Sequence, residues 1–353
     1  MIRVAEEPRF LSLPEALDRL LSPYALEEFA PLTGDGVLVV DLPVEDRRAP
    51  ATTRVEAAAE ALSELACPTV ALAPADPSPA AAALMSAFDV VLPGDAAGLE
   101  SILARIRARP RAALALVQLL RHNAELSIHE GLIAESLVYS TLQAGPEFAE
   151  WLETHSPTPS EETGEPAVQV ERVDATLFLT LNRPARHNAF GVALRDGLVE
   201  GLQLAVWDEE IEEIVLAGAG PSFSSGGDLD EFGTFPDPAT AHTVRSIRNP
   251  GRLLARLADR CRARVHGACI GAGVELPAFV SRVSAAPDAF FQLPELAMGL
   301  VPGAGGTVSL PRRIGRQRTA WLALGGERID AETALDWGLI DRIESDAAAP
   351  RAR

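Results

Sequence analysis

Two glutamates separated by 20 positions, Glu275 and Glu295, each lie beside a glycine-rich stretch of the chain. A further stretch of small residues, PSFSSGGDLDEF, lies upstream at 221–232. Loops of this kind direct backbone N–H groups at one oxygen atom, and two carboxyl groups beside that oxygen can move protons. The pattern therefore predicts chemistry on an activated carbonyl, and we expect that carbonyl to belong to a thioester.

Hydration of an enoyl thioester makes demands that such a site would meet. Negative charge develops on the carbonyl oxygen, so two fixed N–H donors lower the barrier, each by about 3 kcal/mol. A water molecule must lose a proton at the β-carbon while the α-carbon gains one. Two neighbouring carboxyls suit this work because like charges push their pKa values apart, which leaves one group ionised and the other protonated.

The composition excludes several classes of partner. The chain has 353 residues, a formal net charge of −19 and no lysine among its 31 basic residues. Such a charge disfavours nucleic acid and anionic membranes, and arginine or backbone N–H groups would have to bind any ligand phosphate. Three scattered cysteines, no long apolar run and no signal-peptide pattern predict a cytoplasmic protein without a metal site.

The chain divides at a stretch rich in Pro, Ser, Thr and Glu, HSPTPSEETGEPA, which predicts a linker at 155–167. An N-terminal region, 1–154, precedes it; a C-terminal region, 168–345, and a short tail, 346–353, follow. Strand patterns alternate with helix patterns in both regions, and this alternation predicts an α/β fold with crossover connections.

The expected elements follow from hydrophobic periodicity. In the C-terminal region we expect strands over 170–184, 211–217 and 261–270, and helices over 192–207, over 252–260 and from the glycine turn before Glu275. In the N-terminal region we expect strands over 37–42, 69–73 and 89–94, and helices over 54–65, 111–123, 129–145 and 146–153.

The C-terminal region resembles the crotonase superfamily, also called enoyl-CoA hydratase/isomerase. Four segments carry the resemblance: LNRPARHNAF at 181–190, FSSGGDL at 223–229, GACIGAGVEL at 267–276 and FQLPELAMGLVPGAGGT at 291–307. One such glycine motif would be a weak signal, but four in this order are specific. The resemblance implies a crotonase-like core, a spiral of (ββα) units, that acts on an acyl-CoA or a carrier-protein thioester with no further cofactor. It also implies a homotrimer or a dimer of trimers.

The resemblance assigns roles to individual residues. The N–H groups of Gly227 and Ala272 would form the oxyanion hole, Glu275 would activate water, and Glu295 would deliver the proton to the α-carbon. The segment at 181–190 would receive the adenine end of coenzyme A. The residues expected to bind the substrate are Arg186, Asn188, Ala189, Ser225, Gly226, Asp228, Gly271, Pro302, Gly303 and Gly305.

Two departures from the family pattern stand out. Asp230 occupies a position at which the family often has a basic residue that holds coenzyme A, so a carrier-protein thioester remains open as the substrate. The family also continues beyond the position of residue 345 with helices that cover the acyl pocket. We expect residues 54–153, a degenerate partial copy of the fold, to supply equivalent helices here; the alternative is an unrelated N-terminal domain that docks elsewhere.

Other functions remain open at this point. The same oxyanion hole serves isomerases, hydrolases, decarboxylases and cofactor-free dioxygenases, and a non-catalytic assembly subunit is a further alternative. Phe232, Phe235 and Met298 could either line the acyl pocket or belong to the core. Arg245 and Arg248 are the nearest basic candidates for phosphate contacts, with ordinary surface arginines as the alternative.

Overall fold

The N-terminal region forms a parallel sheet of four strands in the order β1-β2-β3-β4. In the computed structural model, the described residues are 10–46, 49–95, 97–155 and 164–345, so most of the expected linker and the tail at 346–353 lie outside them. The strands are β1 (Phe10–Ser12), β2 (Leu38–Asp41), β3 (Thr69–Ala73) and β4 (Val90–Pro93). The three strands expected in this region are therefore confirmed, and β1 is an addition.

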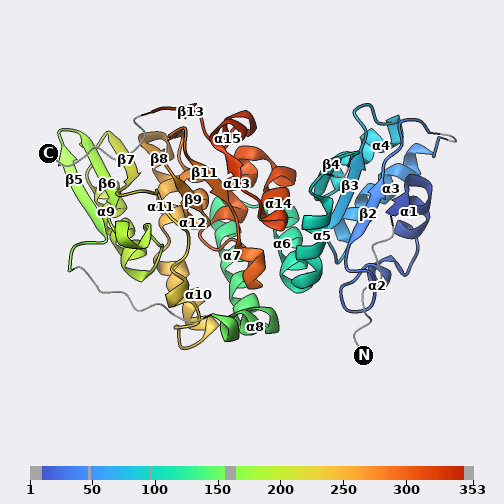
Figure 1. Ribbon diagram of the computed structural model, residues 1–353, viewed down its shortest axis with the longest axis horizontal. Coiled ribbons are helices and arrows are strands. Elements are labelled where there is room, and N and C mark those ends of the chain that lie inside the picture. The colour runs from blue at the N-terminus through green and yellow to red at the C-terminus, as the bar shows by residue number, and fades with distance from the viewer. Residues whose placement is uncertain (1–9, 47–48, 96, 156–163, 346–353) are drawn as a thin grey trace.

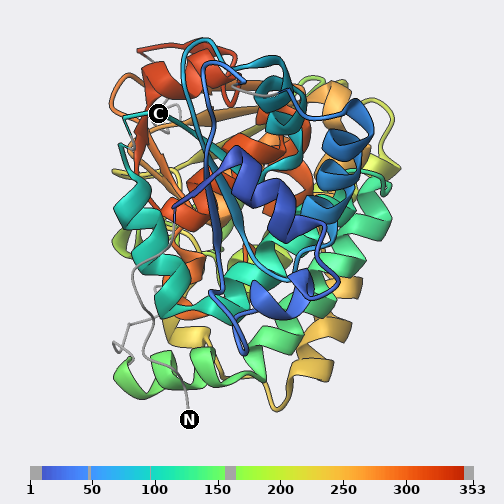
Figure 2. The same cartoon turned by 90° about the vertical axis from the view of Figure 1, so that its right-hand side faces the viewer.

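Helices cover both faces of this sheet. Alternate residues of the buried strand β3 point to opposite sides: Ala71 joins one apolar cluster, whereas Val70 joins the other. One side carries α1 (Leu13–Leu20), α3 (Thr52–Glu64) and α4 (Pro79–Leu84), with the short α2 (Ala25–Glu28) beside them. The opposite side carries α5 (Leu99–Ala108) and α6 (Pro110–Asn123). Figure 2 views this layered end of the molecule face on.

The C-terminal region contains two further sheets. A six-stranded sheet has the order β13-β10-β8-β7-β6-β5, and a three-stranded sheet has the order β12-β11-β9. The larger sheet consists of β5 (Val168–Val173), β6 (Thr176–Leu181), β7 (Glu213–Gly218), β8 (Cys261–Val265), β10 (Arg282–Ala285) and β13 (Arg342–Ile343). The smaller consists of β9 (Ala268–Ile270), β11 (Phe290–Gln292) and β12 (Ile329–Asp330). Helices separate many of these strands, as an α/β fold requires.

The helices of this region are α9 (Val192–Trp207), α10 (Pro238–Ile247), α11 (Pro250–Arg256), α12 (Ala272–Glu275), α13 (Gly306–Ile314), α14 (Arg316–Gly325) and α15 (Ala331–Trp337). The helix expected over 192–207 is confirmed. The helix expected over 252–260 begins earlier because the Asn249 side chain accepts the N–H of Arg252 and caps it, and a separate 3-10 turn forms at Ala258–Arg260. The helix after the second glycine loop is a single turn, which Pro277 follows.

Two expected strands are each divided in the structure. The stretch 170–184 was expected to be one strand, but it contributes to an antiparallel hairpin of β5 and β6, which turns at Asp174 with φ of 53°. Asp tolerates this left-handed conformation. The stretch 261–270 changes sheet between β8 and β9 at Gly267, whose φ is 55° and where a Cβ would lie 2.3 Å from the Pro221 carbonyl oxygen.

The two regions share one apolar core. Residues of the N-terminal sheet, of α5 to α7 and of the C-terminal sheets and helices belong to a single buried cluster. A buried carboxylate also joins them: Asp89 accepts hydrogen bonds from Arg121 and, at 2.9 Å, from Arg316 at the start of α14. The predicted linker therefore separates two segments of chain that share their interior.

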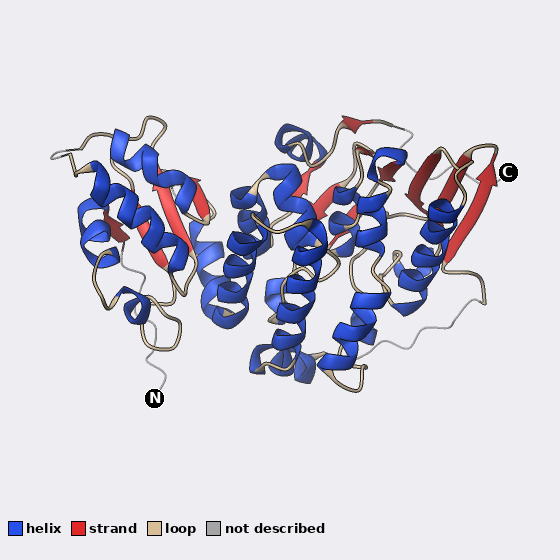
Figure 3. Cartoon of the chain, turned by 180° about the vertical axis from the view of Figure 1, so that it is seen from behind, coloured by secondary structure: helices blue, strands red, loops and turns tan. Residues whose placement is uncertain are grey.

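Three N-terminal helices lie against the C-terminal region, namely α6, α7 (Ile128–Gln143) and α8 (Pro146–Thr154). Figures 1 and 3 show them between the N-terminal sheet and the strands of the C-terminal region. Asn123 Nδ2 donates to the Thr307 carbonyl oxygen at 3.1 Å, and a Cβ on Gly131 would lie 2.9 Å from Val308 Cγ2. The N-terminal region thus lies on α13; its origin as a copy of the fold stays a prediction.

Candidate active site

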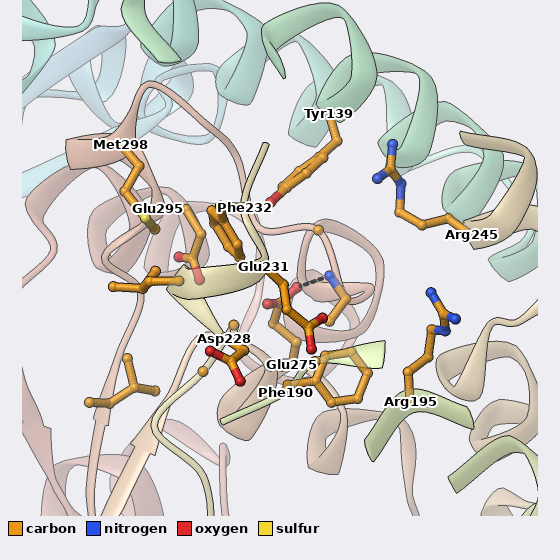
Figure 4. Close-up of a pocket in the computed structure, with 18 of the residues that line it drawn as sticks. Tyr139, Phe190, Arg195, Asp228, Glu231, Phe232, Arg245, Glu275, Glu295 and Met298 are labelled. Carbon is orange, nitrogen blue, oxygen red and sulfur yellow. Dashed lines mark hydrogen bonds between the residues drawn. The ribbon is translucent and has the colours of Figure 1, made fainter. Parts of the chain in front are cut away.

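A cavity of about 370 Å³ lies where the glycine-rich loops meet α7, α8 and α10. Eight of the predicted site residues line it: Ser225, Gly226, Gly227, Asp228, Ala272, Glu275, Glu295 and Gly303. Figure 4 shows Glu275, Glu295 and Tyr139 reaching toward the same central space from different elements. The structure therefore brings both glutamates and both predicted oxyanion donors to one cavity.

The two glycine loops run side by side. Ile270 N donates to the Ser224 carbonyl oxygen at 3.0 Å, and Ser224 N donates to the Ala268 carbonyl oxygen at 3.1 Å. Beyond this pairing, the N–H groups of Gly227 and Ala272 have no hydrogen-bond partner within the described part of the chain. Two unused N–H donors on adjacent loops that line one cavity are the arrangement an oxyanion hole requires.

Gly271 makes the turn before Ala272. Its φ of 49° favours glycine, and a Cβ there would lie only 2.5 Å from Glu295 Oε1. The absence of a side chain at this position therefore serves both halves of the site, because the turn leads to the Ala272 N–H and leaves room for the Glu295 carboxyl.

Backbone N–H groups hold the Glu275 carboxylate. Its Oε2 accepts hydrogen bonds from Ala304 N at 2.7 Å and from Gly306 N at 2.8 Å. Burial raises the pKa of Glu275 above its usual value, and these two hydrogen bonds oppose that rise because they favour the ionised form. The other oxygen, Oε1, accepts no hydrogen bond within the described residues.

Glu295 has different surroundings. It begins a short 3-10 turn, Glu295–Met298, and its buried Oε2 has no hydrogen-bond partner in the described residues. Burial raises the pKa of Glu295 well above its usual value, and the charge of Glu275 raises it further. The surroundings therefore act differently on the two carboxyls: the two N–H donors favour the ionised form of Glu275, whereas burial and the charge of Glu275 favour the protonated form of Glu295.

Sequence reasoning missed a third buried carboxyl, Glu135 of α7. Its Oε1 accepts from Gly305 N at 2.7 Å, and its Oε2 accepts from Thr307 N at 2.9 Å and from Thr307 Oγ1 at 2.7 Å. Burial raises the pKa of Glu135, and the charge of Glu275 adds to the effect. A single acid inside the apolar run GLIAESLVY was the available signal, because buried carboxylates need partners.

Aromatic side chains form one wall of the cavity, and several come from the N-terminal helices. Phe232, from the first loop, packs against Trp151 of α8 with ring centroids 5.9 Å apart. Tyr139 of α7 lies over Gly303, where a Cβ would lie 2.4 Å from its ring. The pocket-lining alternative therefore holds for Phe232, and Phe235 and Met298 also line the cavity.

Six predicted binding residues do not line the cavity: Arg186, Asn188, Ala189, Gly271, Pro302 and Gly305. Asn188 is fully buried, and its Nδ2 donates to the carbonyl oxygens of Ala219 and Ser222, each at 2.9 Å. Arg186 pairs with Asp228 at 2.7 Å and with Asp230. The side chains of Arg186 and Asn188 thus hold the first loop, and the contact expected between the backbone of this segment and the substrate stays a prediction.

The described residues contain no group of three or more His, Cys, Asp or Glu side chains placed to hold a metal ion. No helix within the described ranges is both long and apolar enough to cross a membrane.

Comparison with known proteins bears on the same half of the chain. The family model for enoyl-CoA hydratase/isomerase matches residues 171–350. The 2,3-dehydroadipyl-CoA hydratase of Escherichia coli is 38% identical over 177 residues, which are 49% of this chain and 68% of that protein. The 1,2-epoxyphenylacetyl-CoA isomerase of Escherichia coli is 38% identical over 174 residues, 48% of this chain and 66% of that protein.

Among solved structures, an enoyl-CoA hydratase from Thermoplasma volcanium matches with 32% identity and a TM-score of 0.48, covering 52% of this chain and 73% of that chain. The matched stretch of sequence holds both glycine loops and both glutamates. The chain belongs to the enoyl-CoA hydratase/isomerase family.

Proposed function

We propose that this protein adds water to the double bond of an enoyl thioester, or removes water in the reverse direction, with coenzyme A as the thiol. The observation that carries the proposal is the contrast between the two glutamates. Two N–H donors bind one oxygen of Glu275 and favour its ionised form, whereas Glu295 has a raised pKa and a buried oxygen without a partner among the described residues.

In the proposed reaction, the thioester carbonyl oxygen lies between the N–H groups of Gly227 and Ala272. These donors stabilise the negative charge that develops on that oxygen when the β-carbon is attacked. Glu275 Oε1 accepts a proton from water, and the resulting hydroxide oxygen bonds to the β-carbon. The Glu295 carboxyl donates its proton to the α-carbon, so a base and an acid act on neighbouring carbons.

A second candidate reaction is double-bond isomerisation, because one of the similar proteins is named an isomerase. Isomerisation needs one proton acceptor and one donor but no held water. Hydration is favoured because Glu275 Oε1 accepts no hydrogen bond within the described residues and can therefore hold the water that isomerisation does not use.

The family resemblance also supports proposals for the setting of the protein. We propose a homotrimer or a dimer of trimers in the cytoplasm that needs no cofactor beyond the thioester. Light scattering would measure the assembly, and activity after dialysis against a chelator would test the independence from metals. A carrier-protein thioester that reacts faster than its coenzyme A counterpart would replace coenzyme A in the proposal.

The test measures the loss of enoyl-thioester absorbance with hex-2-enoyl-CoA. Glu275→Gln and Glu295→Gln should each lower kcat by about 10²- to 10⁴-fold, since each removes a proton-transfer group. The control, Glu332→Gln, changes an exposed acid of α15 and should keep the wild-type rate. Wild-type rates in both glutamate variants would refute the proposal, provided that circular dichroism shows that all variants are folded.

A further inference from the structure

Arg245 of α10 lines the cavity and is held entirely by neutral groups. Its Nε donates to Ser136 Oγ at 3.0 Å, and its Nη1 donates to Gln143 Oε1 at 3.4 Å. Nη2 donates to Ser140 Oγ, and the guanidinium carbon lies 4.9 Å from the centre of the Tyr139 ring. These partners form one stripe on α7, since residues three or four positions apart share a helix face.

The other two arginines that line the cavity are already neutralised. Arg195 pairs with Asp196 at 2.9 Å, and Arg248 pairs with Asp196 at 3.0 Å and with Glu200 at 2.9 Å. Arg245, in contrast, has no carboxylate within 4.0 Å among the residues that the structure describes. Of the three arginines that line the cavity, Arg245 is thus the one without a paired carboxylate in the described part of the chain.

Acids elsewhere on the cavity wall do not supply the missing partner. Glu231 accepts the N–H of Val192 at 2.7 Å, and Asp228 pairs with Arg183 at 2.9 Å. Glu135, which faces Arg245 from α7, is occupied by the turn before α13. The half-buried guanidinium of Arg245 is therefore desolvated without a paired carboxylate, and the nearby charge of Glu135 offsets only part of that cost, an arrangement that a ligand anion would complete.

We propose that Arg245 binds a carboxylate at the far end of the acyl chain, which makes the substrate an ω-carboxyacyl thioester. This inference rests on the proposed function, because it assigns the acyl group of the same site. Figure 4 shows Arg245 on one side of the Tyr139 ring and Glu295 on the other, so we expect the bound anion on the far side of that ring from Glu295.

The charge of the ligand group favours a carboxylate over a phosphate as the partner of Arg245. A single guanidinium without a paired carboxylate matches the single negative charge of a carboxylate, and its planar shape suits the two oxygens. The diphosphate of coenzyme A carries two negative charges and would leave one uncompensated. The Tyr139 and Phe232 rings supply apolar surface for the methylene groups that precede the carboxylate.

The test compares two saturated ligands of equal chain length, adipyl-CoA and hexanoyl-CoA, by calorimetric titration of the intact protein. The wild type should bind adipyl-CoA at least about tenfold more tightly, as expected for a charge-assisted pair. Arg245→Gln should abolish that difference while keeping the affinity for hexanoyl-CoA. Arg245→Lys should retain part of it, because the charge persists without the fork.

The matched control is Arg252→Gln, which removes an exposed arginine of α11 that does not line the cavity and should keep the wild-type preference. Equal binding of the two ligands by the wild type would overturn the proposal. If Arg245→Gln weakened the binding of adipyl-CoA and hexanoyl-CoA equally, Arg245 would be assigned to a phosphate contact instead. If the variant kept the preference for adipyl-CoA but melted at a lower temperature, Arg245 would serve only to join α7 to α10. Neither saturated ligand can be hydrated, so failure here is distinct from failure of the hydratase assay.

Discussion

The glycine loops and the N-terminal helices contribute to the cavity in different ways. The loops around Gly227 and Ala272 offer backbone N–H groups, and their positions depend on local turns such as the one at Gly271. The helices α7 and α8 offer side chains, such as those of Tyr139 and Trp151. The proposed reactive groups therefore come from short motifs, whereas the aromatic wall of the cavity depends on packing between segments that are distant in the sequence.

The two parts nevertheless meet at one turn. Glu275 accepts the N–H groups of Ala304 and Gly306, and Glu135 accepts those of Gly305 and Thr307. Glu275 follows the second glycine loop, whereas Glu135 belongs to α7. The four successive N–H groups of this turn therefore donate alternately to a loop carboxylate and to a carboxylate of the N-terminal helices. Substitutions in the loops, in α7 and in the aromatic wall therefore test how far the two parts depend on each other.

The largest effect is expected within the loops. Gly271→Ala would place a methyl group 2.5 Å from Glu295 Oε1 at a φ of 49°, so the acid and the Ala272 N–H must both move. We expect kcat to fall by about 10²-fold or more, as for loss of an oxyanion donor. The control, Gly315→Ala, has a φ of 83° with nothing within 4 Å of the added Cβ. It should lower stability by about 1 kcal/mol and leave kcat unchanged; equal rates in both variants would contradict the geometry.

The next largest effect is expected from Glu135 of α7, which should influence the reaction rate through the turn at 304–307. Glu135→Gln replaces one of the two accepting oxygens with an amide nitrogen, so a hydrogen bond from Gly305 N or Thr307 N is lost at the turn that also holds Glu275. We expect kcat/KM to fall by roughly tenfold. Steady-state kinetics measures this change. Glu125→Gln changes an exposed acid and should keep the wild-type rate; a wild-type rate in Glu135→Gln would show that the turn does not depend on this carboxyl.

A smaller effect concerns stability. Burial raises the folded-state pKa values of Glu135, Glu275 and Glu295, so the folded protein retains protons that the unfolded chain releases above about pH 4.3. Their contribution to the free energy of unfolding should thus be greatest below that pH and fall as pH rises toward the raised values. In Glu295→Gln this slope should be shallower, by up to about 1.4 kcal/mol per pH unit. Urea unfolding across pH would contradict this if the slopes coincide.

The smallest effect belongs to the wall alone. Trp151→Ala removes a ring that lines the cavity and packs against Phe232 at 5.9 Å. We expect KM for hex-2-enoyl-CoA to rise by several-fold while kcat changes little, because the ring binds substrate and transition state alike. Steady-state kinetics would measure this; a fall in kcat comparable to that of Gly271→Ala would erase the distinction between wall and loops.

The sequence alone predicted the catalytic side of the site better than the rest. Both glutamates and the N–H groups of Gly227 and Ala272 meet at one cavity, since glycine-rich turns act over a few residues. The structural role of the Asn188 side chain could not be predicted, because the two carbonyl oxygens to which it donates belong to Ala219 and Ser222, in a distant loop. Glu135 went unnoticed because its partners lie 170 and 172 positions along the chain.

The most direct test of the central claim follows atoms from water into the product. Hex-2-enoyl-CoA would be incubated with the wild type in heavy-oxygen water and, separately, in deuterium oxide, and the product analysed by mass spectrometry. The account predicts heavy oxygen on the β-carbon and deuterium on the α-carbon, with neither in Glu275→Gln. Heavy oxygen in a free carboxylic acid, or a shifted double bond without heavy oxygen, would contradict hydration and assign the site to hydrolysis or isomerisation.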